Sequence, residues 1–165
     1  MNANDYLDLL EIKFQKYFDV SRNMYILDNK IDMFAICNVV NSRTFITQND
    51  IVDSYENNEY CFVKVFDCID SMDIIYFCDF LKEALMKFVK PKANHMNSFI
   101  TGVIVCDGLK EEVIDLVKKF KYSKAYKFYL YGWSEIRLIL IDMKSKRVIS
   151  NKPGKKVIKV YQFTS

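Results

Sequence analysis

Lysines and aromatic residues alternate in one stretch of the last third of the chain. Lysine ammonium groups contact phosphates and aromatic rings stack on bases, the combination that proteins use to hold single strands or RNA. If every second ring faced the core instead, the lysines would simply be solvated. The candidate nucleic-acid-binding residues are Lys118, Lys119, Lys121, Lys124 and Lys127, and the rings between them belong to Phe120, Tyr122, Tyr126 and Phe128.

The charge of the chain is divided unevenly around the same stretch. The formal net charge is +3, but residues 1–117 carry a balance of −8 and residues 118–165 a balance of +11. Such asymmetry is typical of a basic surface that meets a polyanion or an acidic protein. Complementarity between the acidic and basic parts of the chain, or within a dimer, would produce the same pattern.

A second group of residues has the side chains that a catalytic pocket needs. His95 and Asn97 lie close together in the sequence, as do Trp133, Glu135 and Arg137. An imidazole, an amide, a carboxylate and a guanidinium group that converge around a hollow could perform acid–base chemistry. These five residues are therefore candidate pocket residues. His95 lies in a polar segment, where an exposed histidine without a role is the simpler interpretation.

The common signatures of enzymes and metal sites are missing from the sequence. The motifs GxxxxGK[ST], GxGxxG and GxSxG do not occur. A single histidine rules out a His-rich metal site. The five cysteines form no CxxC pair and are odd in number, so we expect free thiols. We assign no catalytic residue, metal or cofactor.

Hydrophobic periodicity predicts one α/β domain over residues 1–165, a mixed β-sheet with helices packed on it. The central unit is a strand (60–66), a helix (72–89) and a strand without polar alternation (99–106), which is typical of a buried parallel strand. The other expected elements are a helix (5–18), strands at 24–27 and 31–40, a helix (109–120), and strands at 126–131, 134–143 and 147–150. Through the strand at 134–143, the predicted order is α-β-β-β-α-β-α-β-β.

Two polar segments complete this prediction. Residues 56–59 are expected to form a loop that leads into the central unit. Residues 156–163 alternate charged and apolar side chains, which predicts an exposed edge strand. A homo-oligomer could pair through that edge.

The sequence shows neither a signal peptide nor a membrane span. Its first five residues are polar and acidic, and no uninterrupted apolar run approaches the length of a transmembrane helix. We therefore expect a cytoplasmic protein with no membrane partner.

The predicted order also resembles the restriction-endonuclease-like (PD-(D/E)XK) core, with Glu11 on its first helix. Asp32 matches the aspartate on that family's second strand, and Lys64 matches the lysine of [DE]-x-K on its third. Phe62 stands where the carboxylate of that motif belongs. Without this ligand two carboxylates cannot converge on Mg²⁺, so the resemblance implies a degenerate, inactive core.

Four short segments resemble a family of short, uncharacterised bacterial proteins. They are ENNEYC (56–61), HMNS (95–98) with the residues up to Gly102, GWSEIRL (132–138) and NKPGK (151–155). The resemblance covers the whole chain and implies no activity. Our leading hypothesis is therefore a non-enzymatic binding protein whose basic C-terminal surface contacts nucleic acid or an acidic partner. The alternatives are an enzyme with a pocket around His95, Asn97, Glu135 and Arg137, or a homo-oligomeric structural module.

Overall fold

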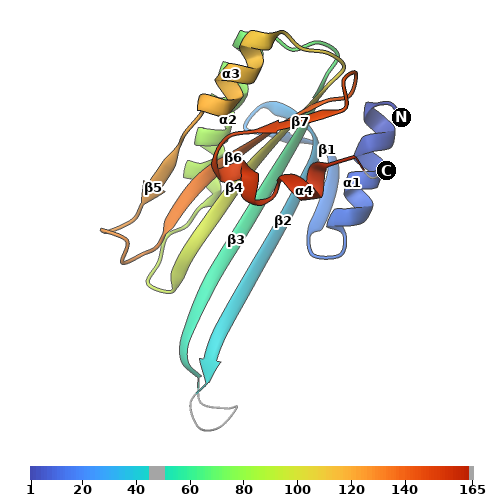
Figure 1. Cartoon of the computed structure of the whole chain (residues 1–165). Coiled ribbons are helices and arrows are strands. Elements are labelled where there is room, and N and C mark those ends of the chain that lie inside the picture. The colour runs from blue at the N-terminus through green and yellow to red at the C-terminus, as the bar shows by residue number, and fades with distance from the viewer. Residues whose placement is uncertain (45–50, 164–165) are drawn as a thin grey trace.

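The chain forms a seven-stranded mixed sheet with helices on both faces (Figure 1). The structure, a computed structural model, describes residues 1–44 and 51–163. In chain order the elements are α1 (Ala3–Phe14), β1 (Asp19–Ile26), β2 (Asn29–Thr44), β3 (Ile51–Phe66), α2 (Ser71–Phe88), β4 (His95–Cys106), α3 (Glu111–Lys119), β5 (Ser123–Ala125), β6 (Trp133–Asp142), β7 (Arg147–Ser150), the 3-10 helix η1 (Pro153–Lys156) and α4 (Ile158–Tyr161). The predicted α/β class and order of elements are confirmed.

The strands lie in the order β1-β2-β3-β4-β6-β5, and β7 also pairs with β6. β4 is parallel to both of its neighbours, β3 and β6, as its apolar sequence predicted. β5 and β7 share one edge of β6 but occupy different parts of it, opposite residues 133–135 and 139–142. A gap therefore separates them, opposite residues 136–138 of β6.

One face of the sheet is covered by α2 and α3. The α2 helix begins after its N-cap Asp70, whose carboxylate accepts a hydrogen bond from the Asp73 amide, and it ends before Pro91. Its apolar side packs closely on β4, since a Cβ atom on Gly102 would lie 3.0 Å from the Phe77 ring and closer still to Leu81. This close approach fixes α2 over the centre of the sheet.

The opposite face is covered by α1 and α4 only in part (Figure 1). Tyr6, Leu10 and Phe14 of α1 pack with Tyr161 of α4 on side chains near the carboxyl ends of the parallel strands. The Tyr6 hydroxyl also donates a hydrogen bond of 2.6 Å to the Tyr161 carbonyl oxygen. Toward the starts of β4 and β6, the same face carries half-buried polar side chains.

Residues 56–59 do not form the predicted loop. They belong to β3 and pair with β2 on one side and β4 on the other. Asparagine and glutamate have low strand propensity, but two neighbouring strands satisfy their backbone groups and outweigh it.

Residues 126–131 do not form the predicted aromatic strand. β5 is only three residues long, and the chain then makes a turn with positive φ at Lys127, Phe128 and Tyr129. A hydrogen bond of 3.1 Å from the Tyr131 amide to the Tyr126 carbonyl closes the turn. An alternation of side-chain types cannot distinguish a strand from such a turn, because it reports only the spacing of the residues.

Residues 156–163 do not form the predicted edge strand. They continue from η1 into α4, and Tyr161 is buried against α1. Val157 and Tyr161 are four residues apart, a spacing that fits one side of a helical turn as well as a strand. This segment therefore offers no edge strand through which two copies of the chain could pair. No helix in the described ranges is long and apolar enough to cross a membrane.

Candidate functional site

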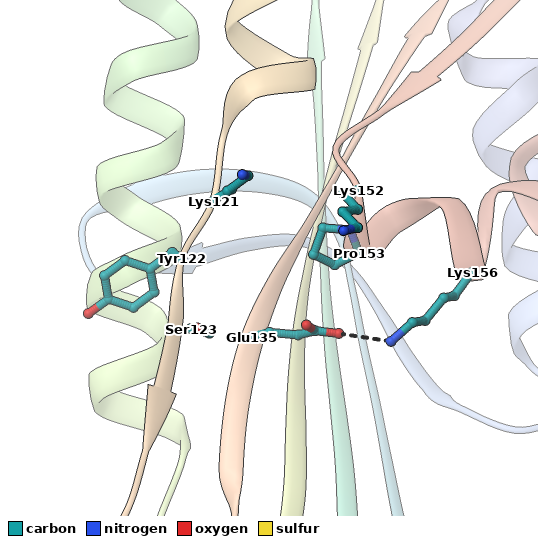
Figure 2. A pocket seen from close by; sticks show the side chains of 7 residues that line it. All are labelled: Lys121, Tyr122, Ser123, Glu135, Lys152, Pro153 and Lys156. Atoms are coloured by element: carbon teal, nitrogen blue, oxygen red, sulfur yellow. Dashed lines mark ion pairs between the residues drawn. The ribbon is translucent and has the colours of Figure 1, made fainter.

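A groove lined by lysines lies where α3 and β5 approach the segment after β7. It consists of two adjoining hollows, of about 330 and 620 Å³, which share Lys152. Figure 2 shows the smaller hollow, with Lys121 on one side, Lys152 and Lys156 on the other and Glu135 between them. The lysines of both hollows, here called the lysine groove, are Lys118, Lys121, Lys152, Lys155 and Lys156.

Three segments bring these lysines together. The last turn of α3 carries Lys118, and the buried Val113 and Val117 fix the orientation of that helix. Lys121 precedes β5, which is held by antiparallel pairing with β6. η1 and the residue before it supply the other three lysines.

The amide of Asn151 joins these segments. It is fully buried in the gap between β5 and β7. Its Oδ1 accepts hydrogen bonds of 3.0 Å from the amides of Leu138 and Gly154. Its Nδ2 donates to the carbonyl oxygens of Ile136 at 3.0 Å and Phe120 at 3.3 Å. One side chain thus replaces the missing strand neighbour of β6 and ties η1 to the end of α3.

Positive charge dominates the groove. Glu135 is the only acidic residue along its described lining, and the Glu135 Oε1 atom lies 3.8 Å from Lys156 Nζ (Figure 2). Among the residues that the structure describes, the other four groove lysines form no ion pair. Four uncompensated ammonium groups around a hollow favour an anion.

The other lysines predicted from the sequence lie outside the groove. Lys119 pairs with Asp115 along α3 at 3.8 Å. Lys124 Nζ lies 3.2 Å from the sulfur of Met86 on α2. Lys127 Nζ lies 4.2 Å from the centre of the Tyr131 ring, in the turn before β6.

Three of the four interleaved rings pack toward the core. Phe120, Tyr122 and Tyr126 contact the apolar cluster under α2, and Figure 2 shows the Tyr122 ring pointing away from Glu135 and Lys156. Only Phe128 is fully exposed. The described lining of the groove therefore offers charge, and its one aromatic residue, Tyr122, turns its ring away from Glu135 and Lys156 (Figure 2).

Four of the five candidate pocket residues share one sheet face. Asn97 and Trp133 are register partners on β4 and β6, and Glu135 and Arg137 follow at every second residue of β6. Arg137 is only 6 % exposed and lies 3.6 Å from the centre of the Phe99 ring. Contacts to its neighbours therefore hold this guanidinium in place.

Glu59 is the ionic partner of Arg137. Its Oε1 accepts hydrogen bonds from Arg137 Nη1 at 3.2 Å and from Thr101 Oγ1 at 3.1 Å. Several buried polar atoms around this pair have no hydrogen-bond partner within the described chain: Asn57 Oδ1, Asn97 Oδ1, Glu135 Oε1 and Arg137 Nε. This polar sheet face therefore brings together a carboxylate, an amide and a guanidinium group, without the imidazole of the fifth candidate, His95.

His95 points to the other side of the sheet. A register shift between Glu56 and Asn57 separates it from Asn97. It is 4 % exposed, with Nδ1 2.7 Å from the Tyr131 carbonyl oxygen and Nε2 2.8 Å from Ser98 Oγ. The interpretation of His95 as an exposed, unengaged side chain is wrong, because β4 begins at this residue and buries the ring.

The comparison with known families gives one match. The family described as a domain of unknown function (DUF8052) matches residues 2–163. The chain belongs to the DUF8052 family. This agrees with the predicted membership of an uncharacterised family. No curated protein and no solved structure matches the chain. The evidence for a site in this DUF8052 protein therefore comes from its own geometry.

The residues that resemble a nuclease have separate structural partners. Asp32 Oδ2 accepts a hydrogen bond of 2.7 Å from the Val65 amide. Glu11 pairs with Arg22 at 2.9 Å, and Lys64 Nζ lies 5.5 Å from the centre of the Phe66 ring. Within the described ranges no three His, Cys, Asp or Glu side chains are grouped as a metal site.

The five cysteines are free thiols. Cys61, Cys78 and Cys106 are buried, Cys37 is half-buried and Cys68 is exposed. Burial raises the pKa of the Cys78 and Cys106 thiols to about 12, which keeps them protonated near neutral pH. These two thiols therefore behave as apolar core groups.

Proposed function

We propose that this protein binds nucleic acid through the lysine groove, with its ammonium groups on the phosphate backbone. One observation carries this proposal: three separate segments converge to place five lysines around two adjoining hollows, with Glu135 as the only acid in the described lining. Phosphate contacts of this kind supply most of the affinity in sequence-independent binding.

The choice of side chains favours phosphate over the carboxylates of an acidic protein. Arginine presents a planar fork that matches a carboxylate in two contacts, whereas lysine acts as a point charge. The described lining of the groove contains lysines and no arginine. The groove therefore recognises the negative charge of a ligand rather than the shape of its anionic group. An acidic protein is the alternative partner.

The proposal treats the chain as a binding protein rather than an enzyme. The polar sheet face supports the enzyme alternative less well, since Arg137 is already engaged by Glu59 and Phe99, and His95 lies on the other side of the sheet. A bacterial source and a cytoplasmic location are part of this proposal and rest on the sequence.

The test compares two variants that each lose four charges. The groove variant carries Lys118→Gln, Lys121→Gln, Lys152→Gln and Lys155→Gln. The control carries Lys16→Gln, Lys30→Gln, Lys110→Gln and Lys144→Gln, four exposed lysines away from the groove. Labelled duplex DNA and single-stranded RNA are titrated at low salt by fluorescence anisotropy.

We expect the groove variant to lose about tenfold or more in affinity, and the control to lose much less, because the groove lysines line two adjoining hollows and the control lysines line neither. Equal losses in both variants would contradict the proposal. Absence of binding to either nucleic acid, with tight binding of polyglutamate, would favour an acidic protein partner instead.

A further inference from the structure

The turn between β5 and β6 displays three large apolar side chains to solvent. Phe128 is 97 % exposed, Tyr129 70 % and Leu130 75 %. Soluble proteins seldom expose contiguous large apolar side chains without a use for them. We call residues 128–130 the apolar tip.

The backbone of the turn is held in an unfavourable conformation. Lys127, Phe128 and Tyr129 have φ values of 45°, 52° and 68°, in the left-handed region that residues with a Cβ atom rarely occupy. Hydrogen bonds from the Leu130 and Gly132 amides to the Lys127 and Tyr129 carbonyl oxygens, both 3.0 Å, stabilise it. Such strain persists only where the surrounding structure imposes it, and it is typical of functional segments.

The core of the protein anchors the turn at its base. The buried His95 ring lies 2.7 Å from the Tyr131 carbonyl oxygen. Gly132, with φ 74°, packs against the backbone of His95 and Met96, where a Cβ atom would clash with their carbonyl groups. The apolar tip therefore projects from a fixed support, and its exposure is built into the fold.

The surroundings of the tip are basic. The sequence contains no acidic residue between Asp115 and Glu135, and none between Glu83 and Asp107. The two acid-free segments meet beside the tip, where Lys124 contacts Met86 and the His95 ring contacts the Tyr131 carbonyl group. We call four of the lysines on these segments the basic collar: the exposed Lys87, Lys90 and Lys127 and the half-exposed Lys124.

We propose that the apolar tip inserts into the surface of an anionic lipid bilayer while the basic collar contacts the headgroups. Aromatic and aliphatic side chains gain stability at the membrane interface, and lysines near an anionic surface add electrostatic attraction. A protruding tip can insert into a bilayer although the bilayer has no pocket of matching shape. Bases would stack on Phe128 and Tyr129 but would leave Leu130 unused, so the membrane accounts for more of the tip.

This proposal departs from the expectation, drawn from the sequence, that the membrane is not a partner. That expectation considered spanning segments, whereas three side chains on a turn only reach the interface. Binding of this kind is reversible and depends on anionic lipid. It is also independent of the lysine groove, which shares no residue with the tip or the collar.

The test is co-sedimentation of the whole chain with vesicles of phosphatidylcholine alone or with about 30 % phosphatidylserine. The tip variant carries Phe128→Ser, Tyr129→Ser and Leu130→Ser. The matched control carries Tyr17→Ser, Tyr25→Ser and Tyr76→Ser, three tyrosines that are 78 %, 76 % and 67 % exposed elsewhere.

We expect the wild type and the control to sediment with the anionic vesicles and much less with the neutral ones. The tip variant should lose about tenfold or more in apparent affinity, since it lacks the inserting side chains. Independently, the emission of Phe128→Trp should shift to the blue on anionic vesicles.

The proposal is overturned if the wild type does not bind anionic vesicles, or if the tip variant binds them as well as the control does. Loss of single-stranded RNA affinity in the tip variant, with vesicle binding unchanged, would identify the tip as a base-stacking element and would also overturn it.

Discussion

The Asn151 side chain determines the shape of the lysine groove through its four hydrogen bonds. It lies where β6 has no strand neighbour, and its amide satisfies the Leu138 amide and the Ile136 carbonyl group. The same side chain holds Gly154 of η1 and Phe120 after α3. A buried amide with every group paired is costly to remove, because its partners remain buried and unpaired.

Replacing Asn151 with alanine should lower the free energy of unfolding by about 2–4 kcal/mol, because several backbone groups lose their partners. Urea denaturation measures this loss. The control is Asn97→Ala, since the Asn97 Oδ1 atom has no partner in the described structure and its removal should cost less than about 1 kcal/mol. Equal losses in the two variants would contradict the role assigned to Asn151.

Individual residues could be predicted from the sequence where local chemistry decides their role. The N-cap Asp70 of α2 is such a residue, because a carboxylate before an amphipathic run has one favourable position. The sequence does not indicate that His95 is buried, because its burial depends on Tyr131 and Ser98, and the first of these is 36 residues away. Nothing in the sequence around Asn151 indicates that it fills a gap between two strands.

At the scale of elements, the long apolar runs were the reliable predictors. α2 buries one continuous apolar face and β4 is buried on both faces of the sheet, so the pattern of each leaves a single solution. Residues 126–131 and 156–163 are short and alternate in type, and the same spacing fits a strand, a turn or a helical turn. Lys152, Lys155 and Lys156 therefore escaped prediction as groove residues, although the run NKPGKK contains all three.

The docking of α4 on α1 is the clearest result that the sequence did not anticipate. Tyr161 is buried between Tyr6 and Phe14 of α1 and Cys61 of β3. The Tyr6 hydroxyl bonds to the Tyr161 backbone, and the Tyr161 hydroxyl has only the Cys61 sulfur, at 3.8 Å, within the described residues. Packing of the ring, rather than its hydroxyl group, should therefore stabilise α4.

Tyr161→Ala should lower the free energy of unfolding by about 3–5 kcal/mol, because it leaves a cavity between α1 and α4. Tyr161→Phe keeps the ring and should change it by less than about 1 kcal/mol. Urea denaturation of both variants, at equal protein concentration, separates the two contributions. An edge strand at this position would give the opposite result, with both substitutions nearly neutral.

At the scale of the whole molecule, the acidic and basic parts of the chain neutralise each other only in places. Lys119 pairs with Asp115 at 3.8 Å, Arg137 with Glu59 at 3.2 Å and Arg147 with Glu111 at 3.6 Å, so three cations of the basic part meet the acidic part. Among the described residues, four of the five groove lysines have no such partner. Internal complementarity therefore leaves a cluster of uncompensated positive charge in the groove, and this cluster carries the central claim about function.

The salt dependence of duplex DNA binding tests this claim most directly. Each phosphate that a lysine neutralises contributes about 0.9 to the slope of log affinity against log salt, so four contacts predict a slope of about −3.6. Lys152→Gln, at the junction of the two hollows, should flatten the slope by about 0.9, while the exposed control Lys16→Gln should leave it unchanged. A slope near zero, or equal flattening by both substitutions, would contradict a nucleic-acid interface at the lysine groove.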